Sequence, residues 1–200
     1  MDINEIKAKT RSMAELVHEM ISLIERGFME NKADFLANAM KKENEINDME
    51  KSLTKDILDM SKASKDGKDK KGLVILEQVI ETLERMGDEA ANLIERIEIK
   101  IAESLLFSDL GVEQFNETYD SMKKSVELMI EFLKGKDSGL RERIIANGFH
   151  VKELVERYRR EHADRLVQGL CSPMGANMYF DMLDFTGNLA RHSSNIVKLF

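Results

Sequence analysis

Apolar residues recur at spacings of three and four along most of the chain, which is the period of a helix that buries one face. Residues 6–28, 35–60 and 73–101 each carry one such stripe. The charged, glycine-containing stretch 61–72 interrupts the pattern, and we interpret it as a break between the second and third helices. These segments predict three helices packed as one bundle.

The same pattern begins again in the second half. Ser108 is a predicted N-cap, and a fourth helix runs from it to a turn at residues 135–139. A long fifth helix then reaches roughly Gly169. Ser172 followed by Pro173 predicts an N-cap with proline at the first position of a sixth helix.

The third and sixth segments align without a gap at an offset of about half the chain, which pairs Asn92 with Asn195. Together with the matching apolar phase, this alignment indicates an internal duplication. We therefore predict an all-α protein whose six helices form two tandem three-helix bundles, over residues 1–104 and 105–200.

Composition narrows the setting. The 200 residues include one proline and eleven glycines, too few for the turns of a β-rich fold. A formal net charge of −7 disfavours a nucleic-acid partner. Cys171 is the only cysteine, so no intrachain disulfide is expected. The absence of a long apolar run or secretory leader predicts a cytoplasmic location.

Two carboxylates four residues apart, Glu84 and Asp88, flank Gly87 inside the third helical segment. Like charges at this spacing repel by a few tenths of a kcal/mol, and glycine in a helix interior costs roughly 0.5 to 1 kcal/mol relative to alanine. We expect a compensating interaction here. The candidates are a cation held between the carboxylates and a neighbouring helix pressed against Gly87.

The acid pair falls at an edge of the apolar stripe, and the second segment places Glu43 and Asn47 at a comparable edge. Oxygen ligands converging from two helices form a site suited to magnesium, manganese, calcium or iron. The alternative is that these acids form surface ion pairs with basic residues nearby in sequence, namely Lys41, Lys42 and Arg85.

These residues carry a family resemblance. Residues 84–93 resemble the E-R-I-G-D-x-A-x-N-I signature of PhoU proteins, and residues 43–50 resemble the acid-x-x-x-D helix that precedes it in that family. The second half is similar to the PhoU-like domain appended to sodium/phosphate cotransporters. That similarity lies in Arg160-Glu161-His162, Arg165-Leu166, Gly169, Cys171-Ser172-Pro173 and Asn195-Ile196.

The resemblance implies a non-catalytic cytoplasmic regulator that restrains phosphate uptake and phosphate-responsive signalling. It implies a metal ion (Fe, Mn, Mg or Zn) at Glu43, Glu84 and Asp88, with Asn47 where the family usually has aspartate. Losing that charge predicts weaker metal binding. The implied partners are phosphate-transporter components and a sensor kinase, with peripheral membrane association and a homodimer as further expectations.

Two alternatives remain open. In the second half Gly187 and Arg191 align with the acid pair, so we expect one metal site at most, and a metal-free helical adaptor or scaffold is the first alternative. The second is a ferritin-like carboxylate di-metal enzyme, suggested by the E-x-x-H spacing of Glu15 and His18. Such an enzyme needs this spacing on two helices, and the sequence has one clear copy.

Overall fold

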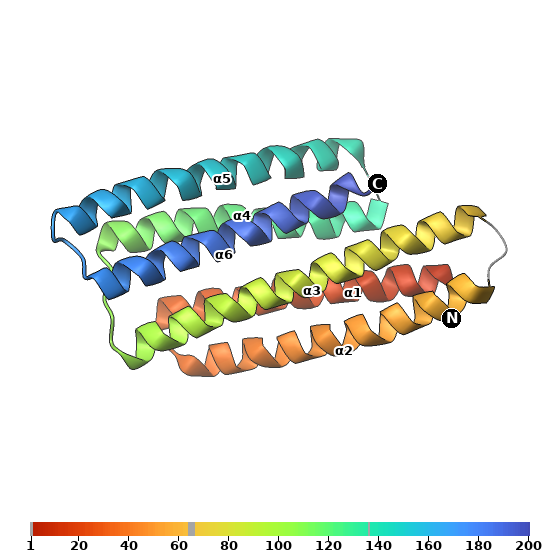
Figure 1. The fold of residues 1–200 in the computed structure, drawn as a ribbon, viewed down its shortest axis with the longest axis horizontal. Coiled ribbons are helices and arrows are strands. Elements are labelled where there is room, and N and C mark those ends of the chain that lie inside the picture. The colour runs from red at the N-terminus through yellow and green to blue at the C-terminus, as the bar shows by residue number, and fades with distance from the viewer. Residues whose placement is uncertain (1, 64–66, 136) are drawn as a thin grey trace.

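The computed structural model describes residues 2–63, 67–135 and 137–200, and six α-helices account for most of them. The helices run lengthwise, and consecutive helices are antiparallel, as Figure 1 shows. The predicted all-α, six-helix fold is confirmed. Their bounds are α1 Ile3–Glu30, α2 Ala33–Ala63, α3 Gly67–Ala102, α4 Asp109–Gly135, α5 Ser138–Val167 and α6 Pro173–Lys198.

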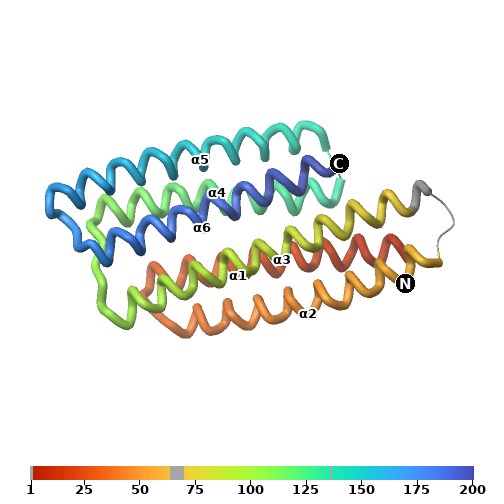
Figure 2. The backbone as a smooth tube through the Cα atoms, in the orientation of Figure 1, coloured from red at the N-terminus to blue at the C-terminus, as the bar shows by residue number. Residues whose placement is uncertain are grey.

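The helices form two groups of three. Within α1 to α3, and again within α4 to α6, every helix contacts the other two. The groups meet through α1 against α4 and through α3 against α6, so α2 and α5 lie on opposite outer edges (Figures 1 and 2). A buried hydrogen bond of 2.7 Å from the Tyr119 hydroxyl to the carbonyl oxygen of Ile21 joins the groups. The exact repeat boundaries, residues 1–104 and 105–200, stay a prediction.

The predicted helix starts follow from side-chain capping. The Ser108 hydroxyl accepts a bond of 3.1 Å from the amide of Gly111, and the Ser172 hydroxyl accepts one of 3.1 Å from the amide of Gly175. Pro173 occupies the first turn of α6, where the missing N–H would have had no helical partner anyway. Both N-caps are therefore confirmed.

The predicted break over residues 61–72 is wrong for most of its length. Helix α2 continues to Ala63 and α3 begins at Gly67, while residues 64–66 lie outside the described residues. Lysine is a good helix former, so a charged stretch can extend a helix into solvent without an apolar face. Helix α5 ends at Val167, slightly before the expected point, and Gly169 takes a left-handed φ of 72° in the turn that follows.

Within the described part of the chain, none of the helices is long and apolar enough to cross a bilayer.

Candidate functional site

The predicted acid pair lies where α3 packs closely on α2. Gly87 is buried, and a Cβ built on it would lie 3.4 Å from Cγ2 of Ile46. A side chain larger than alanine at position 87 would push the helices apart, so a small residue there allows α2 to approach the α3 backbone. The expectation of a neighbouring helix pressed against Gly87 is confirmed.

Glu84 is partly buried beside this contact, whereas Asp88 is exposed. Desolvation raises the pKa of Glu84, and the nearby carboxylates of Asp88 and Glu50 raise it further. Arg85 lowers the pKa of Glu84 by a smaller effect. The carboxylate of Glu84 is thus held among like charges, an arrangement that a cation would relieve.

Glu43 and Asn47 lie one turn apart on α2 and bond to each other. The Asn47 amide nitrogen donates to Oε1 of Glu43 at 2.6 Å. The other amide atom, Oδ1 of Asn47, is buried without a hydrogen-bond partner among the described residues. A buried acceptor without a partner costs about 1 to 3 kcal/mol, so this oxygen is a candidate ligand atom.

The four predicted ligands do not form an assembled metal cluster. Among residues 2–63, 67–135 and 137–200, no group of three or more histidine, cysteine, aspartate or glutamate side chains is arranged to hold an ion. The seam between α2 and α3 therefore supplies oxygen atoms of the right class, but Glu43 is already engaged by Asn47. Metal binding at this seam stays a prediction.

The alternative of surface ion pairs is wrong in its named partners. Arg85 pairs at 2.5 Å with Glu81, a residue one turn before the predicted acid pair. Lys42 pairs with Glu19 of α1 at 3.2 Å and with Glu45 at 3.4 Å. Lys41 donates to the side chain of Asn38 at 3.0 Å. Within the described residues none of these bases forms an ion pair with a predicted ligand, although Arg85 acts electrostatically on Glu84.

The E-x-x-H pair of α1 faces the other helix group instead of a second ligand pair. Nε2 of His18 lies 3.6 Å from Glu127 of α4, and Glu15 lies 3.9 Å from Lys134 of α4. Both contacts help to join α1 to α4. This geometry gives no support to the ferritin-like alternative.

A buried polar cluster in the second group was missed by sequence reasoning. Arg165 donates to Oε1 of Gln114 at 2.9 Å and contacts Nδ1 of His162 at 3.0 Å, and Glu161 accepts a bond from Gln114. The His162 ring stacks on Tyr179 with 4.2 Å between centroids. Burial lowers the pKa of His162 to about 4, with Arg165 as a second cause. The histidine is therefore neutral at pH 7.

Comparisons with known proteins agree with the six-helix fold. Residues 10–97 match the family model described as the PhoU domain. Three solved structures share the fold over nearly the whole chain, although none exceeds 16% sequence identity. No match was found among curated proteins.

The first of these structures is PhoU from Pseudomonas aeruginosa, with a TM-score of 0.92 at 16% identity over 98% of this chain and 94% of that one. The second is the phosphate transport system regulatory protein PhoU from Streptococcus pneumoniae, with a TM-score of 0.87 at 14% identity over 98% and 91%. A PhoU-like protein from Shewanella oneidensis has a TM-score of 0.71 at 13% identity over 96% of each chain.

Proposed function

We propose that this chain is a member of the PhoU family and a non-catalytic regulator of phosphate transport and of phosphate-responsive signalling. The observation that carries the proposal is the PhoU-domain match over residues 10–97. The fold it shares with the streptococcal phosphate transport system regulatory protein supports the same role. Its expected partners are cytoplasmic parts of a phosphate transporter and a sensor kinase, which a long helical face suits.

Deletion of the gene in the native host tests this function. With phosphate in excess, we expect the deletion strain to take up more labelled phosphate than the parent and to express a phosphate-starvation reporter. Expression of the chain from a second locus should restore both readouts. Unchanged uptake and unchanged reporter activity in the deletion strain would reject the regulatory proposal.

We also propose a divalent cation at the α2–α3 seam. The support is the raised pKa of Glu84 among like charges and the buried, unpartnered Oδ1 of Asn47. Glu84, Asp88 and Asn47 would supply hard oxygen ligands, and Glu43 could join them once its bond to Asn47 is broken. A cation there would offset carboxylate repulsion and hold α2 against α3.

Binding of the ion is tested apart from function by melting the purified protein with and without added Mn²⁺, Mg²⁺, Zn²⁺ or Fe²⁺. We expect at least one of these ions to raise the melting temperature of the wild type. Glu84→Ala combined with Asp88→Ala should abolish that rise, whereas Glu95→Ala combined with Glu98→Ala, on exposed positions of the same helix, should not. A wild type indifferent to all four ions would reject the metal proposal and leave the regulatory proposal standing.

A further inference from the structure

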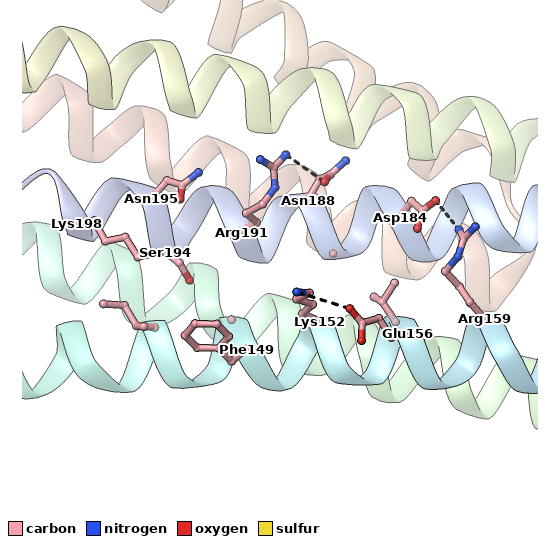
Figure 3. A pocket seen from close by; sticks show the side chains of 14 residues that line it. Phe149, Lys152, Glu156, Arg159, Asp184, Asn188, Arg191, Ser194, Asn195 and Lys198 are labelled. Atoms are coloured by element: carbon pink, nitrogen blue, oxygen red, sulfur yellow. Dashed lines mark hydrogen bonds and ion pairs between the residues drawn. The ribbon is translucent and has the colours of Figure 1, made fainter.

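An elongated groove of about 630 Å³ lies between α5 and α6 on the outer side of the second helix group (Figure 3). Its α5 wall runs from Ile145 to Arg159 and its α6 wall from Asp184 to Lys198. At 1.5 Å per residue, each wall is about 21 Å long, or about four helical turns. The groove is therefore as long as a medium helix.

Close packing of small residues forms the floor of the groove. A Cβ on Gly187 would lie 3.2 Å from Cγ2 of Val155, and one on Gly148 would meet the Ser194 hydroxyl. Figure 3 shows Phe149 on the α5 wall, and 63% of this residue is exposed. An exposed phenylalanine beside an apolar floor provides a surface for apolar side chains of another molecule.

The rim of the groove is cationic in a protein of net negative charge. Four basic and two acidic side chains line it, for a formal charge of +2. Lys152 pairs with Glu156 at 3.6 Å, and Arg159 pairs with Asp184.

The two basic residues of the α6 wall are not matched in this way. Arg191 donates to Oδ1 of Asn188 at 3.1 Å and acts electrostatically on Glu89 of α3, but it contacts no carboxylate among the described residues. Lys198 likewise has no ion pair within the described chain. Both side chains are exposed. They are therefore available to carboxylates of a bound molecule.

We propose that the α5–α6 groove binds an amphipathic helix of a partner protein, with apolar residues on the groove floor and acidic residues beside Arg191 and Lys198. A helix seated between two antiparallel helices completes a four-helix arrangement with α5, α6 and α4 behind them. Apolar anchors of such a helix would recur at i, i+4 and i+7, and they would contact Phe149 and Val155.

Charge spacing favours a helix over a ligand with a single charged head. Arg191 and Lys198 are seven residues apart on one face of α6, which separates them by about two helical turns or 10 Å. Lys152 and Arg159 repeat the same interval on the opposite wall. An amphiphile with one anionic head would need its cations gathered at one end, whereas an acidic helix presents carboxylates at this interval along its length.

The inference rests on the proposed function for the existence of a protein partner, but its test is independent of the phosphate response. The probe is a designed, fluorescein-labelled helical peptide of about five turns, with leucines on one face and glutamates spaced by seven residues on the flank. A second peptide has lysine in place of every glutamate. Fluorescence anisotropy with the purified full chain measures both affinities.

We expect the acidic peptide to bind the wild type and the basic peptide to bind at least about tenfold more weakly, because rim charges select between partners. Arg191→Glu combined with Lys198→Glu should lower the affinity for the acidic peptide by about tenfold or more. Lys51→Glu combined with Lys55→Glu, the same charge change on exposed positions of α2, should leave its affinity within about twofold. Phe149→Ala changes no charge and should also lower the affinity for the acidic peptide.

Equal affinities for the two peptides, or an acidic-peptide affinity unaffected by Arg191→Glu with Lys198→Glu, would overturn the proposal. So would two results pointing to another occupant. One is a wild-type dimer that becomes monomeric in that double variant, which would assign the groove to a second copy of the chain. The other is binding of dodecyl phosphate without binding of the acidic peptide, which would assign it to a single-headed amphiphile. Circular dichroism and melting confirm that each variant is folded.

Discussion

The α2–α3 seam and the α5–α6 groove occupy the same place in their respective helix groups, but their chemistry is opposite. The seam is tightly packed around Gly87 and carries the carboxylates of Glu84 and Asp88. At the aligned positions of the groove stand Gly187 and Arg191, and the space between the helices is open. The same three-helix framework therefore carries an acid pair on α3 in one group and a glycine and an arginine at the aligned positions of α6 in the other.

The two helix groups also contain residues whose protonation affects stability in opposite directions. Desolvation and neighbouring carboxylates raise the pKa of Glu84, so protonation relieves an unfavourable charge in the folded seam. Burial lowers the pKa values of His162 and His192, both in the second group, to about 4. Protonation of these histidines is therefore easier in the unfolded chain than in the folded one.

The largest expected effect is a loss of stability in acid. Between pH 6.5 and 4 the unfolded chain binds protons at His162 and His192 that the folded chain does not, so the free energy of unfolding falls as pH falls. Each histidine contributes at most about 1.4 kcal/mol per pH unit. The raised pKa values of Glu84 and of Glu89, which lies 4.0 Å from His192, oppose part of this loss. Urea unfolding at pH 7 and pH 5 measures the difference.

Matched variants assign the acid effect to the second group. In His162→Phe the ring that stacks on Tyr179 is kept but cannot titrate, so the difference in stability between pH 7 and pH 5 should shrink. His192→Gln should shrink it independently. His150→Gln, at an exposed histidine, should leave the difference unchanged. A difference that survives in the double variant His162→Phe, His192→Gln would contradict the assignment.

Alanine at the packed glycines should have opposite effects in the two regions. In Gly148→Ala the new Cβ would lie 2.3 Å from the Ser194 hydroxyl, and we expect a loss of about 1 kcal/mol of stability from overpacking. In Gly87→Ala the new Cβ would meet Ile46 at an ordinary 3.4 Å, and we expect a gain of about 0.5 kcal/mol from helix propensity. Melting temperatures and urea midpoints measure both.

Removal of the opposing hydroxyl provides the control for the groove glycine. Ser194→Ala deletes the atom that the new methyl group would meet, so Gly148→Ala combined with Ser194→Ala should be more stable than the sum of the single changes predicts. Additive effects would show that Gly148→Ala destabilises the chain for another reason.

The smallest expected effects concern single charges. Glu84→Gln removes repulsion with Asp88 and should stabilise the metal-free protein by a few tenths of a kcal/mol at pH 7. Arg191→Gln removes attraction to Glu89 and should destabilise it by a similar amount. Both stability effects should become smaller in high salt, because salt screens the charges. Shifts of the same sign in the two variants would contradict the charge contrast between seam and groove.

Sequence reasoning succeeds here where the information is local. Apolar periodicity predicted all six helices, and Ser108 and Ser172 marked two helix starts because an N-cap needs only residues within one turn. The cost of Gly87 inside a helical segment led to two candidate explanations, and one of them, contact with a neighbouring helix, is confirmed.

Contacts between helices were beyond that reasoning. The alternative to a metal site named Arg85 among the bases that would neutralise the acids, yet Arg85 pairs with Glu81, which lies four residues away on the same face of the helix. His162 stacks on Tyr179 of α6 and contacts Arg165, which itself donates to Gln114 of α4, so its surroundings come from two other helices. The groove depends on small residues of α5 and α6 that meet at its floor, a pairing that no single stripe encodes.

Because α1, α3, α4 and α6 make all the contacts between the two groups, each outer helix is held from one side by its own group alone. Amide protons of α2 and α5 should therefore exchange with deuterated water sooner than those of the four inner helices. The two surfaces assigned to ligands are each built half from an inner, slowly exchanging helix and half from an edge helix that can adjust. Binding of a ligand to the seam or to the groove should then slow amide exchange along α2 or α5 respectively. These helices lie away from the contacts between the two groups.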